Sequence, residues 1–147
     1  MKKVNILTVL SVLLFSVSLF AGNNMLKEDK AGIEQTVTNY VKSVDFRNAD
    51  ALSKTLLNNG SVITLNSITN NLEHYSGDQF INLVKNGQKG GWVRNVAINS
   101  VDIDGNTAIA KVNITDARLK QTGYFTLVKN NGNWKIASEV TTLELNK

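Results

Sequence analysis

Arg94 and Asp116 are the charged residues of this chain that are best placed to do chemistry as a pair. Arg94 comes two residues before the apolar Val96, and Asp116 comes two residues after the apolar Ile114. Both residues lie on segments that alternate apolar and polar residues. If these segments pair as a hairpin, the two charges face each other on one face of the sheet. Such a couple at a pocket mouth holds a polar ligand group or orients water. A rim ion pair that stabilises the protein by ~0–1 kcal/mol is the simpler interpretation.

Three ring side chains are further candidates. Tyr40 lies beside a helical apolar stripe and either donates its hydroxyl to a ligand or packs as a core ring. Trp92 suits a pocket wall or the core. His74 is the only histidine and a candidate general base, but no acid or nucleophile stands at a fixed spacing, so a solvated or packing role is favoured.

The candidate ligand-binding residues are therefore Tyr40, Trp92, Arg94 and Asp116, and no catalytic residue is assigned. Asp45 is expected to be a solvated charge. A carboxylate with a strongly raised pKa inside the cavity would indicate an enzyme.

The N-terminus predicts export. Two lysines after Met1 precede an apolar run, Val4 to Phe20, and the small residues Ala21 and Gly22, an order typical of a secretory signal peptide. We expect cleavage after Ala21, a flexible lead-in over residues 22–27 and one domain over residues 28–147. The alternative is an uncleaved membrane anchor, but the run is interrupted by polar residues and falls short of the ~20 apolar residues that a span needs.

Composition excludes several classes of protein. The net charge is +4, two of the lysines lie in the predicted signal, and no basic cluster suggests nucleic acid. The chain has no cysteine, so it has no disulfide, thiolate metal site or cysteine nucleophile. One histidine cannot anchor a histidine-rich metal site, and no phosphate loop or dinucleotide fingerprint is present, so neither metal nor cofactor is expected.

Helical patterns occupy the first half of the expected domain. Apolar spacing predicts a helix from Glu28 to Phe46. A shorter helix begins at the N-cap Asn48 and is expected to stop at Asn58-Asn59-Gly60. Ser76-Gly-Asp-Gln79 matches a capping box, which predicts a third helix that ends at Gly87.

The remaining segments read as strands. Two short ones are expected from Ser61 to Leu65 and from about Ser67 to Tyr75. Four long antiparallel strands follow, with tight turns at Asp104-Gly105-Asn106 and at Asn130-Asn-Gly-Asn133. The long strands are expected to begin at Trp92, Thr107, Tyr124 and Trp134.

The register of the first long hairpin can be predicted in detail. Apolar residues change parity between Ile98 and Val101, which implies a β-bulge near Asn99-Ser100. With a two-residue turn at Gly105-Asn106, all the facing pairs are apolar: Ile103 with Ala108, Val101 with Ala110, Ile98 with Val112 and Val96 with Ile114. In the last hairpin the expected pairs are Leu127 with Ile136, Phe125 with Ser138, and Tyr124 with Glu139 on the outer face.

With these motifs in this order, the chain resembles the nuclear-transport-factor-2-like superfamily, and most closely its lumazine-binding-like branch. The residues that carry the resemblance are Ser76-Gly-Asp-Gln-Phe80, the middle hairpin from Asp102 to Val112, and Tyr124 to Ile136. The resemblance implies an α+β fold, with a cone-shaped, curved antiparallel sheet of about six strands packed on three helices from the N-terminal half. It also implies a pocket at the open end and a homodimer through the outer sheet face.

The resemblance does not imply one chemistry, since the superfamily hosts isomerases, dehydratases, epoxide hydrolases, polyketide cyclases and binders. The branch often has a His-Pro-acid stretch where this chain has Asn58-Asn59-Gly60, and an acidic residue where this chain has Gly123. Both departures make an enzyme harder to support.

We therefore expect an exported domain, periplasmic or secreted, that binds a small molecule without catalysis and without membrane association after signal cleavage. One alternative is a hydrolase, isomerase or dehydratase that uses Arg94 and Asp116 with Tyr40 or His74. The other is a structural dimerisation module that assists an exported partner.

Overall fold

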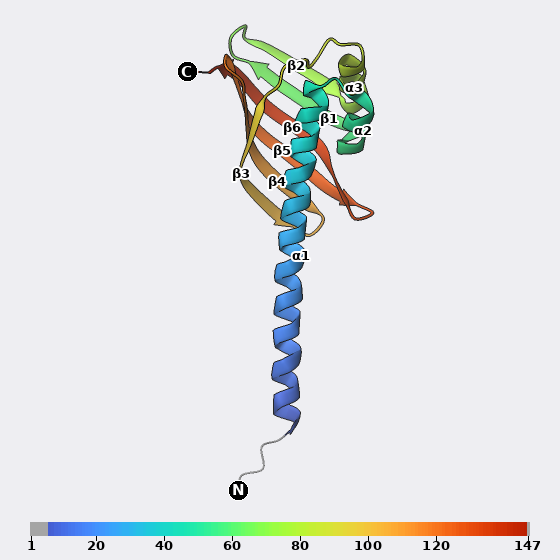
Figure 1. The fold of residues 1–147 in the computed structure, drawn as a ribbon, viewed down its shortest axis with the longest axis vertical. Coiled ribbons are helices and arrows are strands. Elements are labelled where there is room, and N and C mark those ends of the chain that lie inside the picture. Colours follow the sequence, from blue (N-terminus) through green and yellow to red (C-terminus); the bar gives the residue numbers. More distant parts are fainter. Residues whose placement is uncertain (1–5, 147) are drawn as a thin grey trace.

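The computed structural model describes residues 6–146, with side chains from residue 22 onward. Three helices and six strands follow one another along the chain (Figure 1). Their bounds are α1 Ile6–Asp45, α2 Ala49–Thr55, β1 Leu56–Asn66, β2 Asn71–Ser76, α3 Gly77–Lys85, β3 Asn95–Asp104, β4 Thr107–Thr115, β5 Leu119–Asn130 and β6 Asn133–Leu145.

Helix α1 is 40 residues long, and its C-terminal part packs in the core. Residues 22–27, predicted as a flexible lead-in, are instead helical and exposed. A helix can extend into solvent here because each backbone hydrogen bond joins residues four apart and no proline interrupts the series. Residues 1–5 of the predicted signal lie outside the described residues, and cleavage stays a prediction. In the described part of the chain, no helix has both the length and the apolar character needed to span a bilayer.

The predicted cap of α2 is confirmed, but its predicted end is wrong. The Asn48 side chain accepts a hydrogen bond from the Ala51 amide at 2.9 Å. The helix ends at Thr55, and Asn58-Asn59-Gly60 lies within β1. Parallel pairing with β6 draws this segment into the sheet, with an irregularity between Leu56 and Ser61. The second short strand begins at Asn71, because the Asn66 side chain caps a turn before it.

The capping box of α3 is confirmed. The Ser76 side chain accepts from the Gln79 amide, and the Gln79 side chain accepts from the Ser76 amide. Phe80 and Val84 are buried, and the chain turns after the helix at Gly87, whose φ is +74°. This helix and α2 close one side of the core.

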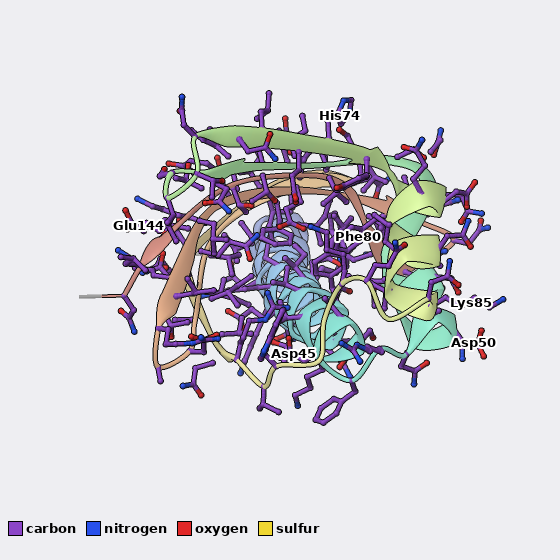
Figure 2. The ribbon with its side chains drawn as sticks, turned by 90° about the horizontal axis from the view of Figure 1, so that it is seen from above. Asp45, Asp50, His74, Phe80, Lys85 and Glu144 are labelled. Atoms are coloured by element: carbon purple, nitrogen blue, oxygen red, sulfur yellow. The ribbon has the colours of Figure 1, made fainter. Side chains whose placement is uncertain are left out.

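The six strands form one mixed sheet in the order β2-β1-β6-β5-β4-β3. Every junction is antiparallel except β1 with β6, which is parallel and which the sequence does not predict. Figure 2 looks down on α1 and shows the sheet curving around the helix, so that the core lies between them. The predicted α+β cone is confirmed.

The predicted register of the β3–β4 hairpin is confirmed. Asn99 is the extra residue, since Ile98 pairs with Val112 and Ser100 with Lys111. The strand itself begins at Asn95 and not at Trp92, so Trp92 lies in the loop after α3.

The β5–β6 register differs from the prediction, because β6 also contains a bulge. Leu127 pairs with Ile136 as expected, but Thr126 pairs with Ser138, which leaves Ala137 unpaired. Phe125 therefore faces Glu139, and the predicted pairs of Phe125 with Ser138 and of Tyr124 with Glu139 are wrong. The extra residue turns Glu139 from the outer face to the inner face, where it is 3% exposed.

Candidate functional site

The open end of the cone contains a cavity of about 170 Å³. Its walls come from α1, α3, the loop between α3 and β3, and five of the strands. Phe80 points toward this interior in Figure 2. The apolar lining residues are Val44, Val62, Phe80, Ile114, Leu119 and Leu143, with the rings of Tyr40, Tyr75 and Trp92 beside them.

All four sequence-predicted candidates line this cavity. Tyr40 is buried at its inner end, and Trp92, 59% exposed, lies at its mouth. Arg94, directly before β3, and Asp116, directly after β4, line it at the open end of the β3–β4 hairpin. His74 is exposed on the outer side of β2, as Figure 2 shows, where its Nε2 lies 3.1 Å from Ser61 Oγ.

Arg94 and Asp116 do not form the predicted couple. Arg94 Nε lies 2.6 Å from Asp45 Oδ1, and the Arg94 amide donates to Asp45 Oδ2 at 2.9 Å. The expectation that Asp45 is solvated is wrong, since its side chain is 2% exposed. It is buried because the end of α1 packs under the loop that leads into β3, where the Gly91 amide also donates to the Asp45 carbonyl at 3.0 Å.

Asp116 instead closes the turn between β4 and β5. Its Oδ1 accepts from the amides of Arg118, at 2.7 Å, and Leu119, at 2.8 Å. These two backbone hydrogen bonds hold the pKa of Asp116 below its usual value.

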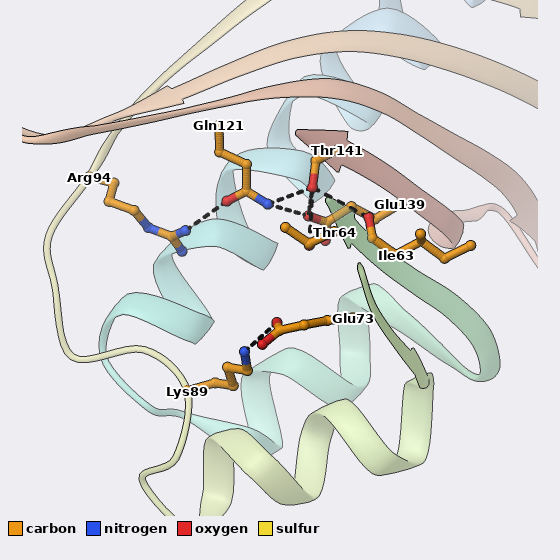
Figure 3. A network of polar contacts seen from close by, with 8 residues as sticks. All are labelled: Ile63, Thr64, Glu73, Lys89, Arg94, Gln121, Glu139 and Thr141. Atoms are coloured by element: carbon orange, nitrogen blue, oxygen red, sulfur yellow. Dashed lines mark hydrogen bonds and ion pairs between the residues drawn. The ribbon is translucent and has the colours of Figure 1, made fainter. Parts of the chain in front are cut away.

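Glu139 is the centre of the polar network in the cavity, and the sequence reasoning missed it. The Tyr40 hydroxyl donates to Glu139 Oε2. Gln121 Nε2 donates to Oε1 at 2.8 Å, and the Thr141 hydroxyl lies 3.3 Å from the same oxygen. Figure 3 shows Gln121 as the bridge to Arg94, whose Nη1 donates to Gln121 Oε1 at 3.3 Å.

Burial controls the ionisation of this network. It raises the pKa of Glu139 above its usual value, and the hydrogen bond from Tyr40 and the charge of Arg94 oppose the increase. The pKa of Tyr40 is raised well above its usual value, first by burial and then by the Glu139 charge. Burial therefore favours the protonated form of the Glu139 carboxyl.

A second polar pair lies across the cavity mouth. Lys89, in the loop after α3, lies 2.6 Å from Glu73 on β2, and its ammonium is 5.5 Å from the centre of the Tyr75 ring. Figure 3 shows this pair apart from the Glu139 network. The loop also needs Gly90, since its φ is +81° and a Cβ there would lie 1.8 Å from the Val44 carbonyl oxygen.

Sequence alone gave no signal for the position of Glu139. Trp134, Ile136 and Val140 share one parity, so β6 reads as an uninterrupted strand with Glu139 outside. Asp45 was missed because its partner Arg94 lies far away in the sequence. Over the side chains that the structure describes, no group of three or more acidic, histidine or cysteine residues could hold a metal ion.

Comparison with solved structures defines the class of fold. An NTF-2 like protein of unknown function from Silicibacter pomeroyi DSS-3 superposes with a TM-score of 0.68 at 21% identity, over 82% of this chain and 98% of that chain. An NTF2-like protein with a cystatin-like fold from Novosphingobium aromaticivorans gives 0.63 at 15% identity, over 84% and 87%. The protein therefore has the nuclear-transport-factor-2-like fold.

The family follows from the sequence match. The family described as "Putative lumazine-binding" matches residues 28–140, and this chain belongs to it. No curated protein shows a significant match.

Proposed function

We propose that this protein binds a small, partly apolar molecule in its cavity and does not convert it. The observation that carries the proposal is a cavity of about 170 Å³ with apolar walls and the Glu139 network on one side. An apolar cavity of ~150 Å³ accepts benzene, so one ring with a polar substituent fits here. Burying ~150 Å² of apolar ligand surface contributes about 4 kcal/mol before the entropic cost of association.

The family description supports a planar heterocycle as the ligand class. Lumazine, the compound it names, is a flat bicyclic ring with polar edges. Phe80 and Leu143 offer apolar surface to such a ring, and Gln121 and Glu139 offer hydrogen bonds to its edge. Lumazine is therefore a suitable first probe.

Native mass spectrometry of the protein purified from its own host tests the binding proposal. We expect a small molecule to co-purify and to be lost on denaturation. A protein that emerges empty and also fails to bind lumazine contradicts the proposal.

An enzyme of the same fold is the second candidate, and Glu139 favours it. A buried carboxyl with a raised pKa in a cavity is the feature expected of a general acid or base. Arg94 no longer supports the predicted catalytic couple, because Asp45 binds it. Incubating the co-purified compound with the protein separates the two: a binder returns it with unchanged mass and isomeric form, whereas an enzyme converts it.

Export and dimerisation complete the proposal. Residues 1–21 support export to the periplasm or the medium, and N-terminal sequencing of the mature chain should begin at Gly22. Ile109, Tyr124 and Val140 lie on the outer face of adjacent strands and are 49%, 53% and 50% exposed, which supports a homodimer through that face. Analytical ultracentrifugation of Tyr124→Asp against the unchanged protein tests it. The cavity weighs against a purely structural dimerisation module, which would fill that space with side chains.

A further inference from the structure

Both cations that line the cavity already have a carboxylate partner. Lys89 pairs with Glu73 at 2.6 Å, and Arg94 pairs with Asp45 at 2.6 Å. Among the ion pairs of residues 22–146, none includes Glu139. The cavity therefore has a buried carboxyl that forms no ion pair with these two cations, although the charge of Arg94 favours its ionised form.

The side chains that donate hydrogen bonds to Glu139 are all neutral. They are the Tyr40 hydroxyl, the Gln121 amide and the Thr141 hydroxyl. A carboxylate accepts about four hydrogen bonds, so these three leave room for one more. The ionised form of a buried carboxyl without a cationic partner is costly, and a ligand that supplies the missing charge stabilises that form on binding.

We infer that the ligand carries a cationic nitrogen group, such as an amidinium or a protonated amine on a ring, and that the Glu139 carboxylate binds it. This inference rests on the proposed binding function. The ring lies among the apolar lining residues, which include Phe80 and Ile114, and the cation points toward Glu139 on β6. A charge-assisted hydrogen bond of this kind is also about twice as strong as a neutral one.

Binding is then coupled to proton release. The charged and titratable groups that act on Glu139 are Tyr40 from α1 and Arg94 from the loop before β3, while β5 and β6 contribute the uncharged Gln121 and Thr141. The same cavity is also lined by Asp116 and by the Lys89–Glu73 pair. Because burial raises the pKa of Glu139, the empty cavity retains its proton to a higher pH than a solvated glutamate does. A cation displaces that proton, so its affinity increases as the pH rises through the pKa of Glu139. A ligand that accepts a hydrogen bond from the protonated carboxyl shows the opposite dependence.

Three probes of the same shape and different charge test the inference: benzamidine, which is cationic, benzamide, which is neutral, and benzoate, which is anionic. We expect calorimetric titration at pH values above the pKa of Glu139 to give at least ~10-fold tighter binding of benzamidine than of benzamide, as a charge-assisted hydrogen bond requires. Benzoate should bind weakest. The preference should disappear in Glu139→Gln, which keeps the shape of the side chain and removes its charge.

Glu144→Gln is the matched control, since Glu144 is an exposed carboxyl on the same strand, where it pairs with Lys120 at the surface. It should keep the full preference. Equal affinities for benzamidine and benzamide, or a preference that survives in Glu139→Gln, overturn the inference and leave cavity binding intact. Failure of all three probes and of lumazine overturns the binding proposal as well.

The pH dependence in the unchanged protein decides the matter if Glu139→Gln does not fold. Affinity for benzamidine that increases with pH, relative to benzamide, supports the inference. A flat or falling ratio overturns it.

Discussion

The Tyr40 hydroxyl on α1 donates a hydrogen bond to Glu139 on β6, 99 positions later in the chain. Both side chains are buried, at 3% exposure each, and both line the cavity. The bond therefore ties the central helix to the middle of the sheet at the place where a ligand would contact the protein. A change at either residue is expected to affect both stability and the site.

Removing the Tyr40 hydroxyl should destabilise the protein. Tyr40→Phe leaves one oxygen of the buried Glu139 without its donor, which costs about 1–3 kcal/mol in the free energy of unfolding. The pKa of Glu139 should rise further, because this hydrogen bond lowers it. Urea denaturation measures the loss. Tyr124→Phe, at a position that is 53% exposed on the outer face, is the control and should change stability by less than ~0.5 kcal/mol.

The free energy of unfolding should decrease as the pH rises through the window between the pKa values of Glu139 in the unfolded and the folded protein. Its pKa is raised in the folded state above the ordinary value of 4.5, so between the two values the folded protein holds a proton that the unfolded chain has released. The free energy of unfolding therefore falls as the pH rises from 4.5 through the raised pKa. Asp116 acts in the opposite sense. Because its pKa is lowered in the folded state, its contribution to stability is lost as the pH falls.

Glu139→Gln isolates this contribution. The difference in urea midpoint between the unchanged protein and the variant should move in favour of the variant as the pH rises across that window. A difference that stays constant with pH would show that the pKa of Glu139 is not raised.

Asp45 and Asp116 should differ in their importance for folding. Asp45→Asn leaves the Arg94 guanidinium, 20% exposed, without its carboxylate, and breaking a buried pair costs about 3–5 kcal/mol. Because Arg94 is partly exposed, we expect the free energy of unfolding to fall by about 3 kcal/mol. Asp116→Asn keeps an oxygen for the two turn amides and should cost less than ~1 kcal/mol. Chemical denaturation of both variants checks the order, and equal losses would contradict the assignment of Asp45 as the partner of Arg94.

Gly123 should not tolerate a side chain. A Cβ at this position would lie 2.1 Å from the Val140 carbonyl oxygen and 2.6 Å from Thr141 Cα, so β5 and β6 must separate to accommodate alanine. Overpacking of this kind costs about 1–3 kcal/mol. Because the shift moves the strand that carries Glu139, Gly123→Ala should also weaken binding of lumazine.

Thermal unfolding measures the loss of stability in Gly123→Ala, and fluorescence titration measures its weaker binding of lumazine. Gly105→Asn is the control: Gly105 lies in an open turn with φ +56°, which asparagine adopts readily, and nothing surrounds its Cβ position. It should change neither property appreciably.

The sequence by itself determined the local structure of this protein. Asn48 and Ser76 specify helix starts through hydrogen bonds to amides three residues away. The β3–β4 register, with its extra residue at Asn99, follows from a two-residue turn and the alternation of apolar side chains on each strand. These features depend on neighbours in the chain, so spacing alone predicts them. Spacing also brought Tyr40, Trp92, Arg94 and Asp116 to attention, and all four line the cavity.

Only the tertiary structure decided which polar groups meet there. Arg94 binds Asp45 and not Asp116, because the end of α1 packs beneath the loop before β3. Glu139 faces the cavity because the bulge at Ala137 reverses the parity of β6, and the apolar Val140 hides that reversal in the sequence. Contacts between residues so far apart depend on strand order and on one unpaired residue, which the alternation of apolar and polar residues along a single strand does not specify.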